Sequence, residues 1–124
     1  MALQESGEMY LETILILAQK QNVVRSIDVA EYMNFSKPAV SRAMAKLKND
    51  RYILIDGDGY IAFTEKGRQI AEKIYERHTM LAHFLMLLGV SEEVAVRDAC
   101  KMEHDISDET FEAMKRHNRE HSDK

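Results

Sequence analysis

The fold is decided by residues 26–63, which read SIDVAEYMNFSKPAVSRAMAKLKNDRYILIDGDGYIAF. Ser26 is a favourable N-cap for a short helix over 27–33, and the tight connection that follows ends at Ser36. Ser36 predicts the N-cap of the next helix, because Pro38 then occupies the first turn, where its missing N–H group costs nothing. This helix is expected to end near Asp50.

The hydrophobic period changes after residue 51. Two β-rich runs, residues 52–55 and 60–63, flank the turn sequence Asp-Gly-Asp-Gly and predict a short hairpin. Helix, helix, tight turn, helix and hairpin is the order of a winged helix-turn-helix. In that arrangement the helix after the turn enters the major groove, and the wing lies along the DNA backbone or minor groove.

Helical patterns lie on both sides of this stretch. Residues 8–21 predict an amphipathic first helix, and a long helix is expected from Thr64 to a stop at Gly89. Two further helices are expected, one from Ser91 to about His104 and one capped by Ser107. The chain is therefore predicted to be mainly α with a small β-hairpin wing, with a DNA-binding domain over 1–64 and a helical domain over 65–124.

Composition limits the class of protein. The chain has 124 residues, which suits one compact domain or two small ones. Its single Cys cannot form an internal disulfide, and neither a membrane-spanning run nor a secretory signal is visible, so a cytoplasmic location is expected. The formal net charge of -4 argues against binding nucleic acid by bulk charge alone.

The local charge points the other way. Residues 34–51 hold five basic residues against Asp50 alone, a net +4 within an acidic chain. This concentrates positive potential on the predicted recognition helix. An ordinary solvated helix face would look similar, so the order of the elements carries the argument. The candidate DNA-binding residues are Arg25, Ser36, Lys37, Pro38, Ser41, Arg42 and Lys46.

A second constellation lies in the predicted fifth helix. Cys100, Glu103 and His104 stand at i, i+3 and i+4, so they project from one helical face. Thiolate, carboxylate and imidazole together form a partial shell for a divalent transition metal. Alternatively, the three are packing and surface residues of a metal-independent regulator. A small metalloenzyme is a third class, but no separate general base or Gly-rich substrate loop accompanies the cluster.

Four segments together resemble the diphtheria-toxin-repressor family of iron- and manganese-dependent repressors. They are Glu8–Glu12, Ser36–Ser41, Arg77-His78 and Cys100–His104, and they occur in order over nearly the whole chain. The resemblance implies a winged-helix domain followed by a helical dimerisation domain, with metal between the first helix and the dimerisation helices. It also implies a metal-activated repressor of metal homeostasis genes that binds a palindromic operator as a homodimer, with no membrane or small-molecule substrate.

The resemblance also implies a ligand set. Met9, Cys100, Glu103 and His104 stand where iron-type members place ligands, whereas Glu12 and His78 match further ligands of manganese-type members. Two positions of the iron-type ancillary site fall on Ala82 and Val96, so that site looks broken, and neighbouring His83 would point elsewhere. Soft thioether and thiolate ligands favour Fe(II), Co(II), Ni(II) or Zn(II) over the harder Mn(II), whereas carboxylates and imidazoles suit Fe(II) and Mn(II) equally. Fe(II) is therefore expected first, then Mn(II), with Zn(II) or Co(II) also compatible.

The expected dimer would rest on the last three helices, since no third, SH3-like domain follows them in this sequence. The apolar candidates for its interface are Phe84, Leu85, Leu87, Leu88 and Phe111. His117 and His121, four residues apart near the end, suit a polar helix end better than a metal clip, and no role is assigned to them.

Overall fold

The computed structural model describes residues 5–122, with side chains described from 6 to 120. That part of the chain holds six helices and two strands: α1 (Glu5–Lys20), α2 (Ser26–Met33), α3 (Lys37–Asn49), β1 (Ile53–Ile55), β2 (Ile61–Phe63), α4 (Glu65–Leu87), α5 (Glu92–Met102) and α6 (Asp108–Ser122). The predicted fold class, mainly α with a small hairpin, is confirmed. The chain divides into two compact units, unit 1 ending at Glu72 and unit 2 beginning at Lys73.

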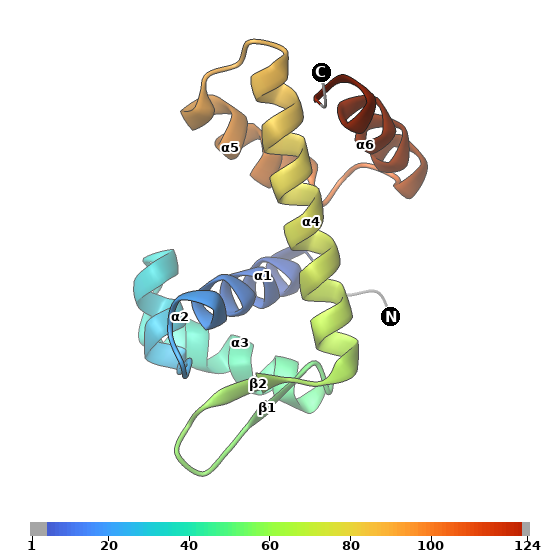
Figure 1. The fold of residues 1–124 in the computed structure, drawn as a ribbon. Helices are drawn as coiled ribbons and strands as arrows, with labels where there is room; N and C mark the ends of the chain where they lie inside the picture. Colours follow the sequence, from blue (N-terminus) through green and yellow to red (C-terminus); the bar gives the residue numbers. More distant parts are fainter. Residues whose placement is uncertain (1–4, 123–124) are drawn as a thin grey trace. The chain divides into compact units, whose positions relative to one another are not determined.

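Unit 1 is built around α1, α2 and α3, which Figure 1 shows gathered beside the hairpin. The predicted stripe of α3 is confirmed, since Val40, Met44 and Leu47 are all buried. The Ser36 hydroxyl accepts a hydrogen bond from the Ala39 N–H at 3.3 Å and so caps α3. Because these three residues occupy one face of the helix, the opposite face of α3 is exposed to solvent.

The hairpin is a two-stranded antiparallel sheet in which Ile53 pairs with Phe63 and Ile55 with Ile61. Its turn is ordered by Asp56, whose carboxylate accepts hydrogen bonds from the backbone N–H groups of Asp58 and Tyr60, both at 2.9 Å. Gly59 has a φ of +83°, a conformation that side chains rarely adopt. Turn chemistry thus fixes the tip of the wing locally.

The hairpin leads directly into α4 through a close backbone approach. The Thr64 hydroxyl accepts a hydrogen bond from the Gly67 N–H at 3.1 Å and caps α4 as predicted. The Thr64 N–H donates to the Tyr52 carbonyl oxygen at 3.2 Å. A Cβ on Gly67 would lie 2.8 Å from the Tyr52 carbonyl carbon, so only glycine fits here. These contacts explain why the first two turns of α4 belong to unit 1.

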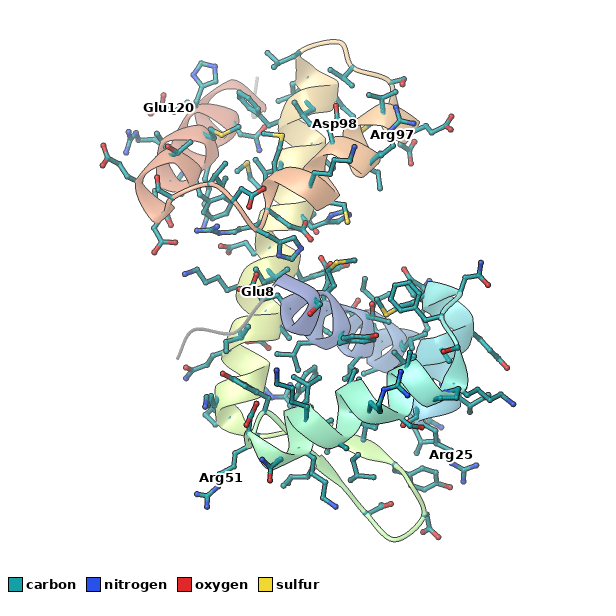
Figure 2. All side chains as sticks on the ribbon, turned by 180° about the vertical axis from the view of Figure 1, so that it is seen from behind. Glu8, Arg25, Arg51, Arg97, Asp98 and Glu120 are labelled. Carbon is teal, nitrogen blue, oxygen red and sulfur yellow. The ribbon has the colours of Figure 1, made fainter. Side chains whose placement is uncertain are left out.

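Unit 2 comprises the C-terminal part of α4 with α5 and α6, which lie on opposite sides of it (Figures 1 and 2). Its core is formed by Met80, Leu81, Ala82, Ala99 and Phe111. The predicted cap of α6 is confirmed, since the Ser107 hydroxyl accepts a hydrogen bond from the Thr110 N–H at 3.1 Å. Gly89, with a φ of +103°, follows the end of α4.

Three details differ from the sequence expectations. Arg25, not Ser26, is the N-cap of α2, because its N–H donates to the Asp28 carboxylate at 2.8 Å from the first turn of the helix. Phe111 is 3 % exposed and packs inside unit 2, whereas Leu87 and Leu88 are exposed. Ser91 is the N-cap of α5, but its hydroxyl makes no capping hydrogen bond.

No helix among the described residues is long and apolar enough to cross a membrane.

Candidate metal centre and nucleic-acid interface

The outer face of α3 carries the residues predicted to meet DNA. Ser36, Lys37, Pro38, Ser41, Arg42 and Lys46 are all exposed. The small residues at the helix start leave room for a close approach, and the long basic side chains further along reach outward. Ser36 also caps the helix, so its hydroxyl oxygen is engaged while its proton remains able to donate.

Arg25 lies where α2 meets the wing. Its guanidinium stacks over the Tyr60 ring at 4.7 Å and donates to the Tyr60 hydroxyl at 3.2 Å. The Ile61 N–H donates to the Val24 carbonyl at 2.8 Å, which ties β2 to the residue before Arg25. Figure 2 shows the Arg25 and Arg51 side chains pointing away from the body of unit 1. Tyr60 was not predicted to hold Arg25, because no sequence spacing links residues 35 apart.

Unit 2 brings together three of the predicted metal ligands. Glu103 is completely buried, and one of its oxygens, Oε2, lies 2.9 Å from His78 Nδ1. The other oxygen, Oε1, lies 3.4 Å from Nε2 of His104, whose side chain is 1 % exposed. One carboxylate therefore faces two imidazole nitrogens, one on α4 and one just beyond α5. A buried carboxylate needs such partners, since an isolated buried charge is costly.

These residues fit a divalent transition metal by their chemistry. Carboxylate oxygen and imidazole nitrogen bind such ions at about 2.0–2.2 Å, which places two ligands of one ion about 3 Å apart. The two Glu103–histidine separations, 2.9 and 3.4 Å, are close to that value. Glu103 Oε1 has no hydrogen-bond partner although it is buried. A cation would satisfy this oxygen.

The other predicted ligands lie on two helices. Cys100 is half-buried on α5, one turn before Glu103. In unit 1, Met9 and Glu12 stand three residues apart on α1, so they share a helix face. Met9 is half-buried and Glu12 is buried. The sequence analysis expected Met9 and Glu12 on the first helix and Cys100 on the fifth, and the structure places them there.

The loop between α5 and α6 is held by residues that the sequence analysis gave no role. Buried Arg77, on α4 next to His78, hydrogen-bonds to the carbonyl oxygens of Glu103 and Ile106 and to the Asp108 carboxylate. A hydrogen bond from Lys73, with its positive charge and that of Arg77, holds the pKa of Asp108 below its ordinary value. The pair Arg77-His78 was noted only as part of a family motif.

The order of the elements, the wing and the exposed basic helix together define a winged helix-turn-helix DNA-binding domain. It is followed by a helical unit that holds a buried carboxylate between two imidazoles. Two family models match the chain. Residues 2–61 match the iron-dependent repressor N-terminal DNA-binding domain, and residues 64–121 match the metal-binding and dimerisation domain of the same repressors. The chain therefore belongs to the iron-dependent repressor family, whose members are transcriptional regulators.

Relatives of known name agree with this assignment. The HTH-type transcriptional regulator MntR of Geobacillus kaustophilus is 36% identical over 102 residues, which are 82% of this chain and 72% of that protein. The transcriptional regulator MntR of Escherichia coli O157:H7 is 33% identical over 115 residues, 93% of this chain and 74% of that protein.

Solved structures are also similar. The manganese regulator SloR matches with a TM-score of 0.78 at 29% identity, over 94% of this chain and 54% of that one. The metal-dependent transcriptional regulator MtsR matches with a TM-score of 0.82 at 26% identity, over 89% and 52%. The chain thus spans about half the length of these solved proteins.

Proposed function

We propose that this protein is a transcriptional repressor of metal homeostasis genes whose binding to DNA is activated by a divalent metal ion. The observation that carries the proposal is the buried Glu103 carboxylate facing the imidazoles of His78 and His104, in a chain whose first unit is a winged helix. Family membership supports it, since the two matching models describe a DNA-binding domain and a metal-binding, dimerising domain. The proposed protein is a cytoplasmic homodimer without catalytic activity.

The proposed roles follow the two domains. Residues 1–64 bind DNA, with α3 in the major groove and Arg25 gripping phosphate, and residues 65–124 bind metal and dimerise. The DNA contacts are assigned to the exposed residues of α3 and to Arg25. The metal ligands are assigned to Met9, Glu12, His78, Cys100, Glu103 and His104, of which Met9 and Glu12 rest on the family resemblance. A two-fold dimer would favour a palindromic operator.

The bound ion would supply positive charge and a fixed coordination geometry. His78 and His104 would each offer a neutral ring nitrogen and Glu103 a carboxylate oxygen. Ligands contributed by both domains would then fix the angle between the two DNA-reading heads of a dimer, so that metal binding and operator binding strengthen each other. Such coupling is reciprocal by thermodynamic necessity.

The identity of the metal is a finer part of the proposal. The thioether of Met9 and the thiolate of Cys100 favour Fe(II). Structures of relatives described as a manganese regulator and as a manganese-dependent repressor with manganese favour Mn(II) instead. We propose Mn(II) as the first ion to test and Fe(II) as the second, with Zn(II) and Co(II) as comparisons.

The test measures DNA affinity with and without metal. A duplex is selected from a random library by the protein in Mn(II), and its binding is followed by fluorescence anisotropy in chelator, in Mn(II) and, without oxygen, in Fe(II). We expect chelator to weaken binding at least tenfold and metal to restore it. The variant His104→Ala should lose this response, whereas His83→Ala, which changes an exposed histidine outside the cluster, should keep it. Equal affinity in chelator and metal would overturn the proposal in favour of a metal-independent regulator.

A further inference from the structure

Arg77 is a buried arginine of unit 2, with 6 % of its surface exposed. It lies on α4, directly before His78. One terminal nitrogen, Nη1, donates to the Glu103 carbonyl at 3.1 Å and to the Ile106 carbonyl at 2.9 Å. The other, Nη2, binds the Asp108 carboxylate at the first residue of α6. A single guanidinium therefore ties α4 to the end of α5, to the loop and to the start of α6.

The three groups that accept from Arg77 lie at residues 103, 106 and 108, within or just after the segment that holds the proposed metal ligands Glu103 and His104. Glu103 is the C-cap of α5, and His104 follows it. Carbonyl groups at a helix C-terminus have no partner within the helix, and the helix dipole makes this end negative. Arg77 satisfies the Glu103 carbonyl with a charged donor, so the backbone of a proposed ligand is fixed from the same helix that carries His78.

An arginine is suited to this position. Its guanidinium is planar, stays charged when buried and presents several donors in a rigid fork. Asp108 supplies the opposing charge, and Lys73 contacts the same carboxylate at 3.1 Å from an exposed position. Lys73 thus shares the ion pair with Arg77. Among the described residues it forms no hydrogen bond with the Glu103 or Ile106 carbonyl, which makes it a useful control.

We propose that Arg77 is a positioning residue that sets the distance between His78 and the Glu103–His104 segment for metal binding. This inference rests on the proposed function. It makes a prediction opposite in sign to that of simple electrostatics. A positive charge near a cation site weakens cation binding, so its removal should tighten binding if charge were the only effect. Loss of the hydrogen bonds to the loop should instead weaken metal binding.

The experiment measures the Kd of Mn(II) by electron paramagnetic resonance of the free ion. Circular dichroism first fixes a temperature at which each metal-free variant is folded. We expect Arg77→Gln to raise the Kd about tenfold or more, as is usual for residues that orient metal ligands. Arg77→Lys keeps the positive charge but loses the planar set of guanidinium donors, so it should raise the Kd of Mn(II) less than Arg77→Gln does. Lys73→Gln should leave it within about twofold of the wild type, because no ligand segment moves.

The outcomes separate a positioning role from a merely structural one. A structural role would lower the melting temperature of the metal-free protein and leave the Kd of the folded variant unchanged, and that result overturns the inference. If Arg77→Gln does not fold, Arg77→Lys decides: weaker binding supports the inference and equal binding overturns it. If the wild type binds no Mn(II), Fe(II) or Zn(II), the proposed function falls together with this inference. If the wild type binds metal and the variants match it, only the inference falls.

Discussion

Replacing Gly67 by Ala tests how the wing is joined to α4. An added Cβ would overlap the Tyr52 carbonyl oxygen and lie 2.8 Å from its carbon, and both obstacles are backbone atoms that cannot rotate away. Overpacking of this kind costs about 1–3 kcal/mol. If α4 moved away from Tyr52 to relieve this overlap, two hydrogen bonds would be strained. The Thr64 N–H and hydroxyl donate to the Tyr52 carbonyl oxygen at 3.2 and 3.1 Å, and each bond is worth about 1 kcal/mol.

Helix propensity acts in the opposite direction. Ala is better than Gly inside a helix by about 1 kcal/mol. The net expectation is a destabilisation of about 2 kcal/mol, or a fall in melting temperature of roughly 8 °C or more. Urea unfolding followed by far-ultraviolet circular dichroism measures the free energy of unfolding directly.

A matched control is Gly57→Ala in the wing turn, where nothing lies within 4 Å of the new Cβ and φ is not positive. Its free energy of unfolding should stay within about 0.5 kcal/mol of the wild type. The reasoning is refuted if Gly67→Ala is as stable as the wild type, or more stable.

Three further substitutions test the cap, the recognition face and the charge on Asp108. Ser36→Ala removes the acceptor for the Ala39 N–H and should lower the free energy of unfolding by about 1 kcal/mol; an unchanged urea midpoint would contradict this. Arg42→Ala should weaken operator binding and leave the Kd of Mn(II) unchanged, as titrations of both ligands would show. Asp108→Asn should destabilise the protein near neutral pH, and its difference from the wild type in urea should shrink in acid. The sign follows because the folded pKa is lowered, so the stabilisation is present above the ordinary carboxyl pKa and is lost as pH falls through the folded value.

Local signals made much of unit 1 predictable. The start of α3 follows from the cap at Ser36 and from Pro38 in the first turn. Its buried face follows from the helical spacing of Val40, Met44 and Leu47, and the exposed face is the one opposite. The start of α2 was predicted one residue too late. The N-cap preference looks for a residue whose own side chain accepts a hydrogen bond, which pointed to Ser26. In α2 the accepting side chain is instead that of Asp28, in the first turn of the helix.

Contacts between distant segments were not predictable in the same way. Arg77 and Asp108 are 31 residues apart, and Arg25 and Tyr60 are 35 apart. Neither pair follows from a helical or strand period, because each depends on how three elements pack. For the metal cluster, the i, i+3, i+4 spacing predicted that Cys100, Glu103 and His104 act together, but His78 was linked to them only through the family resemblance. The 2.9 Å approach of His78 to Glu103 adds a physical reason for that link.

Charge distribution bears on how a metal could act on DNA binding in this acidic chain. Residues 34–51 carry a net +4, while the wing turn carries Asp56 and Asp58, which would be repelled by phosphate. Attraction would therefore rest on α3 and Arg25. A divalent ion would add +2, but the Glu103 carboxylate and an ionised Cys100 would together carry −2 and cancel that charge at the site. The effect of metal on DNA affinity would then come from coordination geometry and not from net charge, so ions of equal charge, such as Mn(II) and Zn(II), should activate binding to different extents.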